Sequence, residues 1–300
     1  MRILVTGANG YIGRNFFANW HSEESVEWVL CDLKMKQNLV STSPVSFVEG
    51  DLADSIFCQS LIGEYAPDVI VHLAGIPSLQ ESKQSNVEVF SANVLPTQWL
   101  LSALQFEEHP CHFIFASTGI IYGDQAKPMG ESSPVNPKNN YGLSKLLGEV
   151  AINYFQKSSP QHAFTIIRPS VVYGEDQKGD MFIPSLVNSI KSKKPFAMTK
   201  GEQYRDFIHV KDLCDAIQAL IQKRMTGTYN VSSGEKIQLR EVAEFVAKVS
   251  GRPELLELGK IPYRKNEVWN YALNNAKLQA DTNWRPSRDL FNELKKLLQD

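Results

Sequence analysis

Short apolar runs rich in β-branched residues alternate along the first half of the chain with longer amphipathic stretches. Runs of three to five such residues are typical of buried strands, and apolar residues spaced three and four apart predict helices. The expected strands are 3–5, 28–31, 46–48, 69–73, 112–116 and 164–167, and the expected helices are 12–21, 55–65, 86–105 and 141–157. Strands that alternate with helices need crossover connections, so the pattern predicts an α/β fold with a doubly wound parallel sheet.

The alternation weakens after about residue 168, where prolines break the chain into short pieces. Helices are expected only at 183–191, 210–222 and 239–249. We therefore expect a dinucleotide-binding domain over 1–168 and a smaller, mixed α/β substrate domain over 169–300. The segments near 207–231 are expected to return to the first domain.

Length, charge and cysteine content exclude several classes of protein. The 300 residues are enough for two domains, and 31 Lys+Arg against 33 Asp+Glu leave no basic excess for binding nucleic acid. No run reaches the roughly 18 apolar residues that a membrane span requires. Cys31, Cys58, Cys111 and Cys214 form no CxxC pair, which is typical of reduced thiols in a cytoplasmic protein and predicts no metal site.

Three glycines follow the first expected strand in a G-x-x-G-x-x-G pattern made by Gly7, Gly10 and Gly13. Glycines let the backbone turn tightly and approach a pyrophosphate, whose charge is then favoured at the N-terminus of the helix that begins at Tyr11 and Ile12. The alternative is a glycine-rich turn between a strand and a helix that binds nothing.

Acidic residues follow the second and third expected strands. Asp32 lies about 20 residues after the glycines, where a carboxylate accepts hydrogen bonds from the adenosine ribose and repels a 2′-phosphate. This favours NAD, although Lys34 and Lys36 leave NADP possible. Asp51 is placed to contact adenine, whereas Asp54 suits the N-cap of the next helix.

A tyrosine and a lysine, Tyr141 and Lys145, are four positions apart and share one face of an expected helix. A nearby ammonium and the positive nicotinamide ring both favour the phenolate, so we expect Lys145, helped by the ring, to lower the pKa of Tyr141 toward the range of general acid/base catalysis. Thr118, at the end of the fifth expected strand, is suited to hold a substrate oxygen. The alternative is an exposed helix pair without a catalytic role.

Together these motifs resemble the extended short-chain dehydrogenase/reductases, in particular the NAD-dependent epimerase/dehydratase group that acts on nucleotide sugars. The resemblance covers nearly the whole chain. The matching segments are TGANGYIG at 6–13, DLAD at 51–54, VHLAG at 71–75, STGIIYG at 117–123, YGLSK at 141–145, RPSVVYG at 168–174, RDFIHVKD at 205–212 and GTYNVSSG at 227–234.

The resemblance implies a Rossmann domain with a substrate domain, and roles for individual residues. It implies Thr118, Tyr141 and Lys145 as the catalytic set, and Arg205 and Arg264 as ligands of the sugar-nucleotide diphosphate. It also implies a homodimer formed through the helices at 94–105 and 141–155, which are apolar on more than one face. The implied NAD-binding residues are Gly7, Gly10, Tyr11, Ile12, Gly13, Asp32, Asp51, Leu52, Leu73, Ala74, Gly75, Asn93, Tyr141 and Lys145.

Departures from the family pattern narrow the chemistry. The 4,6-dehydratases carry an acid two residues after the catalytic threonine, and this chain has Ile120 there. Val171 replaces a usual asparagine, which leaves the sugar and the nucleotide open. The segment 259–269 resembles reductases and epimerases of 6-deoxy-4-keto sugars.

These features leave three functions open. A nucleoside-diphosphate hexose 4-epimerase is slightly favoured, because Asp32 favours NAD. The alternatives are an NAD(P)H-dependent reductase of nucleotide-linked 4-keto-6-deoxyhexoses and a non-catalytic regulator that binds a dinucleotide. The histidines are expected to be structural: His109 and His112 enter a strand, and His209 is a satisfied core histidine.

Overall fold

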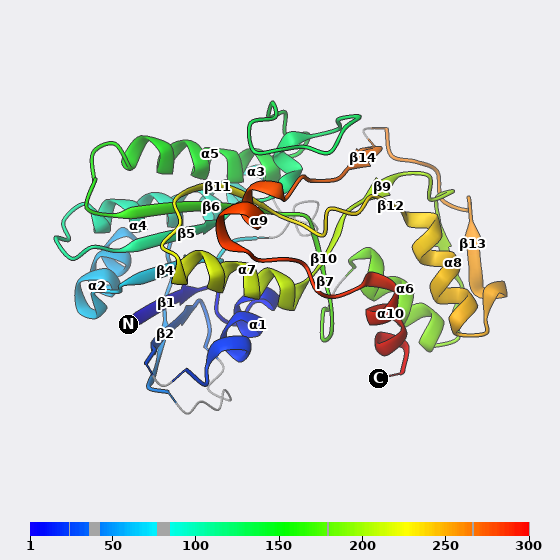
Figure 1. The fold of residues 1–300 in the computed structure, drawn as a ribbon, viewed down its shortest axis with the longest axis horizontal. Coiled ribbons are helices and arrows are strands. Elements are labelled where there is room, and N and C mark those ends of the chain that lie inside the picture. The colour runs from blue at the N-terminus through cyan, green and yellow to red at the C-terminus, as the bar shows by residue number, and fades with distance from the viewer. Residues whose placement is uncertain (24, 36–42, 77–84, 179, 266, 300) are drawn as a thin grey trace. The chain divides into compact units, whose positions relative to one another are not determined.

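The computed structural model describes residues 1–23, 25–35, 43–76, 85–178, 180–265 and 267–299. A seven-stranded sheet has the strand order β11-β6-β5-β4-β1-β2-β3, and the pairs among β1 to β6 are parallel (Figure 1). The strands are β1 (Arg2–Thr6), β2 (Glu27–Asp32), β3 (Val45–Glu49), β4 (Val69–His72), β5 (His112–Ala116), β6 (Ala163–Pro169) and β11 (Gly227–Val231). The predicted doubly wound fold and its first six strands are confirmed.

The strand order reverses at β1, which pairs with β2 on one side and with β4 on the other. Ligands of open α/β sheets bind at such a reversal, outside the carboxyl ends of the strands. Thr6 pairs with Cys31 and with His72, so the segments that follow β1, β2 and β4 leave the sheet at one level. The predicted site residues of these segments therefore share one edge.

Helices cover both faces of this sheet. Figure 1 shows α4 and α5 on one face and α1 and α7 on the other. Apolar residues of α2, α4 and α5, among them Ile62, Leu104 and Ile152, pack with Phe113 and Ile166 of the sheet in one core. The helices are α1 (Tyr11–Trp20), α2 (Ser55–Tyr65), α3 (Asn86–Asn93), α4 (Leu95–Leu104), α5 (Asn140–Phe155) and α7 (Val210–Gln222).

The single helix predicted over 86–105 is wrong, because the structure has α3 and α4 there. Pro96 stands at the start of α4. A proline has no N–H to donate, and its ring clashes with the carbonyl four residues earlier, so the helix is interrupted at this point. The break places Asn93 at the end of α3.

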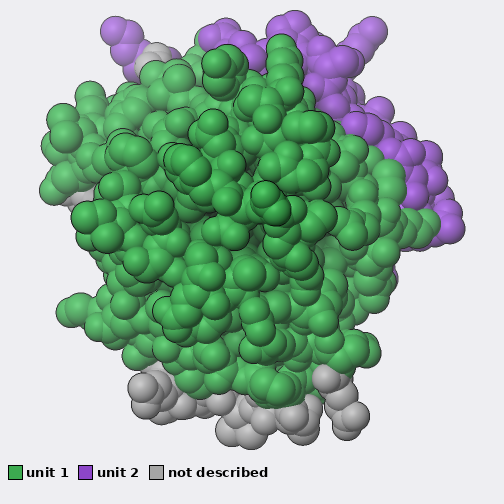
Figure 2. Space-filling model, turned by 90° about the vertical axis from the view of Figure 1, so that its left-hand side faces the viewer, with its two compact units in different colours: residues 1–121, 137–168, 214–229 green, residues 122–136, 169–213, 230–300 purple. Residues whose placement is uncertain are grey.

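The chain divides into two compact units, which Figure 2 distinguishes by colour. Unit 1 consists of residues 1–121, 137–168 and 214–229, and unit 2 consists of residues 122–136, 169–213 and 230–300. No helix in the described ranges is long and apolar enough to cross a membrane.

Unit 2 has a core of its own between α6, α8 and α10, with Leu186, Val242 and Leu294 fully buried. Several of its elements were not predicted: α10, α9 and short strands of two or three residues. Its elements are β7 (Val171–Tyr173), α6 (Phe182–Lys191), β8 (Phe196–Met198), β9 (Tyr204–Arg205), β10 (Phe207–His209), β12 (Ile237–Gln238), α8 (Leu239–Val249), β13 (Leu256–Leu258), β14 (Asn270–Tyr271), α9 (Ala276–Thr282) and α10 (Leu290–Gln299), with a short 3-10 turn at Pro253–Leu255. A further 3-10 turn, Gly119–Tyr122, has its first three residues in unit 1.

Candidate active site

The glycine-rich turn after β1 packs so tightly that it admits no side chain at Gly7 or Gly13. Gly7 has φ of +68°, and a Cβ atom there would lie 2.7 Å from the Ala74 nitrogen. A Cβ atom on Gly13 would lie 2.4 Å from the Gly7 carbonyl oxygen. Both contacts are with backbone, which cannot move aside as a flexible side chain can. The turn therefore needs glycine at both positions.

The N-terminus of α1 opens directly from this turn. Gly10 is the N-cap, no side chain caps the helix, and its first turn, which includes Tyr11, Ile12 and Gly13, has no acidic residue. The first N–H groups of a helix lack partners within the helix and carry partial positive charge. An anionic group suits this position, because the chain itself supplies none there.

Two of the predicted acids lie at the carboxyl ends of β2 and β3. Asp32 Oδ2 accepts a hydrogen bond from the Asn9 N–H (2.9 Å), and Oδ1 accepts one from Leu33 (2.8 Å). A carboxylate has lone pairs for further donors, so these two bonds orient the group and leave it able to accept hydroxyl hydrogen bonds. Asp51 is exposed and accepts from the Ala53 N–H (2.8 Å), next to the buried Leu52.

Asp54 is the N-cap of α2, as predicted: its carboxylate accepts from the N–H groups of Ile56 and Phe57. Sequence analysis named two lysines near a possible 2′-phosphate. Lys34 is exposed, whereas Lys36 lies outside the described residues.

The segment after β4 lies against both the glycine turn and the side chains of α3 and α5. The Leu73 N–H donates to the Thr6 carbonyl (3.2 Å). The backbone of Ala74 occupies the space that a Gly7 side chain would need. Gly75 has φ of +149°, and a Cβ atom there would lie 2.7 Å from Asn93 Oδ1 and 3.4 Å from Lys145 Nζ. The chain thus brings Asn93 and Lys145 together around this glycine.

Asn93 is buried and fixed from several sides. Its Oδ1 accepts from the Ile76 N–H (2.7 Å), and its Nδ2 donates to the Ser144 hydroxyl of α5 (3.0 Å). The residue therefore supports the α5 turn that carries Tyr141 and Lys145.

Tyr141 lies in the first turn of α5, whose N-cap is Asn139 (2.8 Å from its Oδ1 to the Gly142 N–H). The Tyr141 phenol is hydrogen-bonded to the Thr118 hydroxyl. Lys145 follows one turn later, is 4 % exposed, and its Nζ lies 5.0 Å from the centroid of the Phe115 ring. The structure therefore brings the three predicted catalytic residues together.

The ionisation expected for Tyr141, which depends on Lys145 and on a nicotinamide ring together, stays a prediction. Burial raises the pKa of the phenol to about 12, although the hydrogen bond with Thr118 acts in the opposite direction. Burial also lowers the pKa of the Lys145 ammonium to about 8. Removal from water disfavours both charged forms.

The two predicted diphosphate ligands, Arg205 and Arg264, lie in unit 2. Arg205 Nη2 pairs with Glu267 Oε1 (2.9 Å), and its Nη1 donates to the carbonyls of Tyr204 (2.8 Å) and Val268 (2.7 Å). These contacts fix the guanidinium of Arg205, whereas the Arg264 side chain is exposed. The sequence did not indicate Glu267 as a partner.

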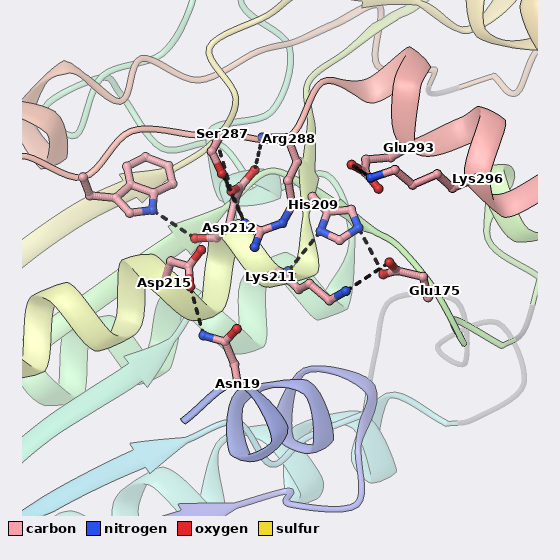
Figure 3. Close-up of polar contacts among 11 residues, drawn as sticks. Asn19, Glu175, His209, Lys211, Asp212, Asp215, Ser287, Arg288, Glu293 and Lys296 are labelled. Carbon is pink, nitrogen blue, oxygen red and sulfur yellow. Dashed lines mark hydrogen bonds and ion pairs between the residues drawn. The ribbon is translucent and has the colours of Figure 1, made fainter. Parts of the chain in front are cut away.

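His209 belongs to a cluster with two glutamates in unit 2 (Figure 3). Its Nδ1 accepts from the Lys211 N–H (3.3 Å), which leaves Nε2 as the protonated nitrogen facing Glu175 (3.2 Å). Lys211 also pairs with Glu175 (3.1 Å), and Lys296 pairs with Glu293 (2.8 Å). Each carboxylate therefore already has a cation, which favours ion pairs over a metal centre.

His109 and His112 lie at the entrance of β5, where His109 pairs with Asp68 (2.8 Å) and His112 with the Thr165 hydroxyl (2.8 Å). Sequence analysis missed a buried ion pair between Glu149 and Arg168. The detectable signal was an acid four residues after Lys145, on the same helical face.

Comparisons with known proteins agree with this geometry. A family model described as "NAD dependent epimerase/dehydratase family" matches residues 3–232. An uncharacterized UDP-glucose epimerase, YtcB of Bacillus subtilis (strain 168), is 30% identical over 286 residues, which cover 90% of this chain and 89% of that protein. The dTDP-glucose 4,6-dehydratase of Mycolicibacterium smegmatis is 27% identical over 304 residues, with 97% and 90% covered.

Among solved structures, the chain is similar to the UDP-glucose 4-epimerase of Thermus thermophilus in complex with NAD. The TM-score is 0.88 at 25% sequence identity, and the match covers 100% of this chain and 98% of that one. The similarity therefore extends over both units.

Proposed function

This chain belongs to the NAD-dependent epimerase/dehydratase family, and on that premise we propose that it inverts carbon four of a nucleoside-diphosphate hexose with NAD as its cofactor. The observation that carries the proposal is the group formed by Tyr141, Thr118 and Lys145 at the sheet edge where the glycine turn also lies. Two similar proteins described above are UDP-glucose epimerases, so UDP-glucose is the first substrate to test.

The residues of the glycine turn fit a dinucleotide. The turn, which needs glycine at positions 7 and 13, and the uncapped start of α1 suit a pyrophosphate, and Asp32 suits the ribose hydroxyls. The carboxylate of Asp32 supports NAD rather than NADP. The remaining proposed contacts lie on the same sheet edge, namely Tyr11, Ile12, Asp51, Leu52, Leu73, Ala74, Gly75 and Asn93.

The chain's own residues would handle the proton at carbon four. Oxidised NAD supplies a hydride acceptor and a positive ring charge that favours the Tyr141 phenolate. The Tyr141 oxygen takes the proton of the C4 hydroxyl and later returns it, while the Thr118 hydroxyl holds the C4 oxygen. Lys145 adds positive charge beside both. Epimerisation ends with no net oxidation of the sugar.

The substrate's diphosphate would be held by Arg205 and Arg264. A guanidinium pairs with phosphate oxygens through its planar set of donors. Glu267 orients the Arg205 guanidinium and offsets its positive charge. The affinity of a Glu267 variant for the nucleotide would measure this effect.

Dehydration at carbons five and six is not supported, although one relative is a 4,6-dehydratase. Ile120 occupies the position two residues after Thr118, and its side chain has no group that transfers a proton. Its backbone N–H donates to the Thr118 hydroxyl oxygen (3.3 Å), so this residue orients Thr118.

We also propose a homodimer formed through α5. Leu143, Leu147, Val150 and Tyr154 make an apolar stripe along this helix and are 38%, 39%, 56% and 77% exposed. Exposed apolar stripes of this kind mark protein interfaces. On α4, by contrast, most apolar residues pack inside unit 1. A cytoplasmic location is supported by the four cysteines, which are buried free thiols.

The proposal is tested by denaturing freshly purified protein and quantifying any released dinucleotide. Nearly one NAD per chain supports an epimerase, which regenerates its cofactor in each cycle. Protein that binds NADPH or NADH reversibly supports instead the 4-ketoreductase suggested by the segment 259–269. Failure to bind any dinucleotide refutes both.

A further inference from the structure

A buried ion pair connects the helix that carries Tyr141 and Lys145 to the sheet. Glu149 of α5 is 2% exposed and Arg168 of β6 is 7% exposed. Arg168 donates from Nε to Glu149 Oε1 (2.9 Å) and from Nη2 to Oε2 (2.5 Å). The two parallel hydrogen bonds fix the orientation of the carboxylate as well as its position.

The same carboxylate also binds the residue before Thr118. The Ser117 hydroxyl donates to Glu149 Oε1, and the Ser117 N–H donates to the Ile167 carbonyl of β6 (2.9 Å). Ser117 is thus tied to α5 by its side chain and to β6 by its backbone. Because Thr118 is the next residue, these two bonds fix the backbone from which its side chain projects.

Glu149 shares a helical face with Lys145 and Tyr141, which precede it by four and eight residues. The helix packs closely on β5 at this level, because a Cβ atom on Gly148 would lie 2.6 Å from the Phe115 ring. A shift of α5 along the sheet would therefore move all three side chains together relative to Thr118. The carboxylate of Glu149 is a polar contact that ties this part of α5 both to β6 and to Ser117.

Stability alone does not explain a buried charge pair. Apolar residues of similar volume in place of such a pair are often neutral or stabilising, because desolvation of the two charges offsets their attraction. What the pair does provide is a defined relative position of α5, β6 and the end of β5. Catalysis depends on such positions, since a misplacement of about 1 Å costs on the order of 100-fold in rate.

We propose that Glu149, held by Arg168, is a positioning residue that acts through Ser117 to keep the Thr118 hydroxyl within hydrogen-bonding distance of the Tyr141 phenol. This inference rests on the catalytic roles proposed above. It assigns a function to Ser117, Glu149 and Arg168, which lie outside the proposed catalytic set.

The first test is Ser117→Ala in the NAD-loaded enzyme, which removes the link and keeps the ion pair. We expect kcat to fall about 10-fold to 100-fold, with the KM for the nucleotide sugar and the bound NAD unchanged. Thr165→Val is the matched control, because it removes a buried hydroxyl that bonds His112 on the same sheet. If kcat of Ser117→Ala equals that of wild type, the inference is wrong.

A second readout does not depend on turnover. The hydrogen bond with Thr118 lowers the pKa of Tyr141. The phenolate absorbance of NAD-loaded Ser117→Ala, taken as a difference from the same protein with Tyr141→Phe, should therefore develop at higher pH than in wild type. Identical titrations contradict the inference, even if the sugar substrate has been wrongly chosen. Wild-type protein that turns over no nucleotide sugar refutes the proposed function instead.

A third comparison separates positioning from stability. The double variant Glu149→Met, Arg168→Met keeps the buried volume and removes both charges, so we expect its thermal stability to equal or exceed that of wild type. Its kcat should nevertheless fall as in Ser117→Ala. Equal kcat in a folded double variant contradicts the proposal, and Glu149→Met alone should unfold more easily because Arg168 is left unpaired.

Discussion

Replacing Lys145 with methionine should abolish activity and make the folded protein more stable. Lys145 is 4% exposed, and burial lowers its pKa from 10.5 to about 8. Below pH 8 the folded protein therefore holds an ammonium that would be better solvated in the unfolded chain. Methionine has a similar length and no charge, so it fills the site without this cost.

The size of the effect follows from the pKa shift. One pK unit corresponds to about 1.4 kcal/mol, so the shift from 10.5 to about 8 represents about 3 kcal/mol of destabilisation at pH 7. The Phe115 ring, whose centroid is 5.0 Å from Nζ, offsets about 1 kcal/mol of it by cation–π attraction. We expect the free energy of unfolding of Lys145→Met to exceed that of wild type by about 2 kcal/mol at pH 7.

The difference should depend on pH with a defined sign. Between pH 8 and 10.5 the unfolded chain still binds the Lys145 proton while the folded protein has lost it, so wild-type stability rises through this window relative to the variant. The full difference is present below pH 8. It closes as the pH approaches 10.5, the value of the unfolded lysine.

The assay is urea unfolding of both proteins at pH 7 and pH 10, after removal of bound dinucleotide, which would stabilise only the folded state. Lys157→Met, at an exposed position just after α5, is the control and should change stability by less than about 0.5 kcal/mol. A variant that is less stable than wild type at pH 7, or a difference that stays constant with pH, would refute the assigned cost of burying Lys145.

Four further outcomes are expected. Tyr141→Phe should lower turnover about 10²-fold to 10⁴-fold. The control Tyr122→Phe, which loses a buried hydrogen bond to Asn230, should keep normal turnover. Near-normal turnover of Tyr141→Phe would show that Tyr141 is not the proton carrier. Asp32→Ala should relax the preference for NAD over NADP in equilibrium binding, and unchanged selectivity shows that another group contacts the ribose. Gly13→Ala, whose Cβ would lie 2.4 Å from the Gly7 carbonyl oxygen, should yield protein without bound dinucleotide. One dinucleotide per chain in this variant would contradict the proposed role of the glycine turn. Val150→Glu, at a position 56% exposed, should sediment as a monomer where wild type sediments as a dimer, and an unchanged dimer places the interface elsewhere.

The parts of the fold that sequence analysis predicted well are those with local signals. Each of the first six strands is an apolar run followed by a turn, and the glycines after β1 are required by contacts of the turn itself. The strands of unit 2 are two or three residues long, which is too short to show the alternation of apolar and polar residues that identifies a strand. In contrast, α10 has apolar residues at 290, 294, 297 and 298, a helical spacing that was detectable.

The candidate site shows the same division. Tyr141 and Lys145 were identifiable because both lie on one helix, and Thr118 because it ends a strand. The pairing of Glu149 with Arg168 joins two elements and depends on how α5 lies on the sheet, which spacing does not describe. The sequence shows the charge near Tyr141 but not the burial, which raises the pKa of the phenol in the chain alone.

The most direct test of the central claim is to incubate the purified protein with UDP-glucose, without added dinucleotide, and to follow the sugar by NMR. The account predicts that the C4 epimer forms up to an equilibrium mixture and that no 4-keto or 4,6-dehydrated sugar accumulates. Accumulation of a 4-keto-6-deoxy sugar, or C4 reduction of a 4-keto sugar that consumes added NADPH or NADH while no epimer forms from UDP-hexoses, would contradict it.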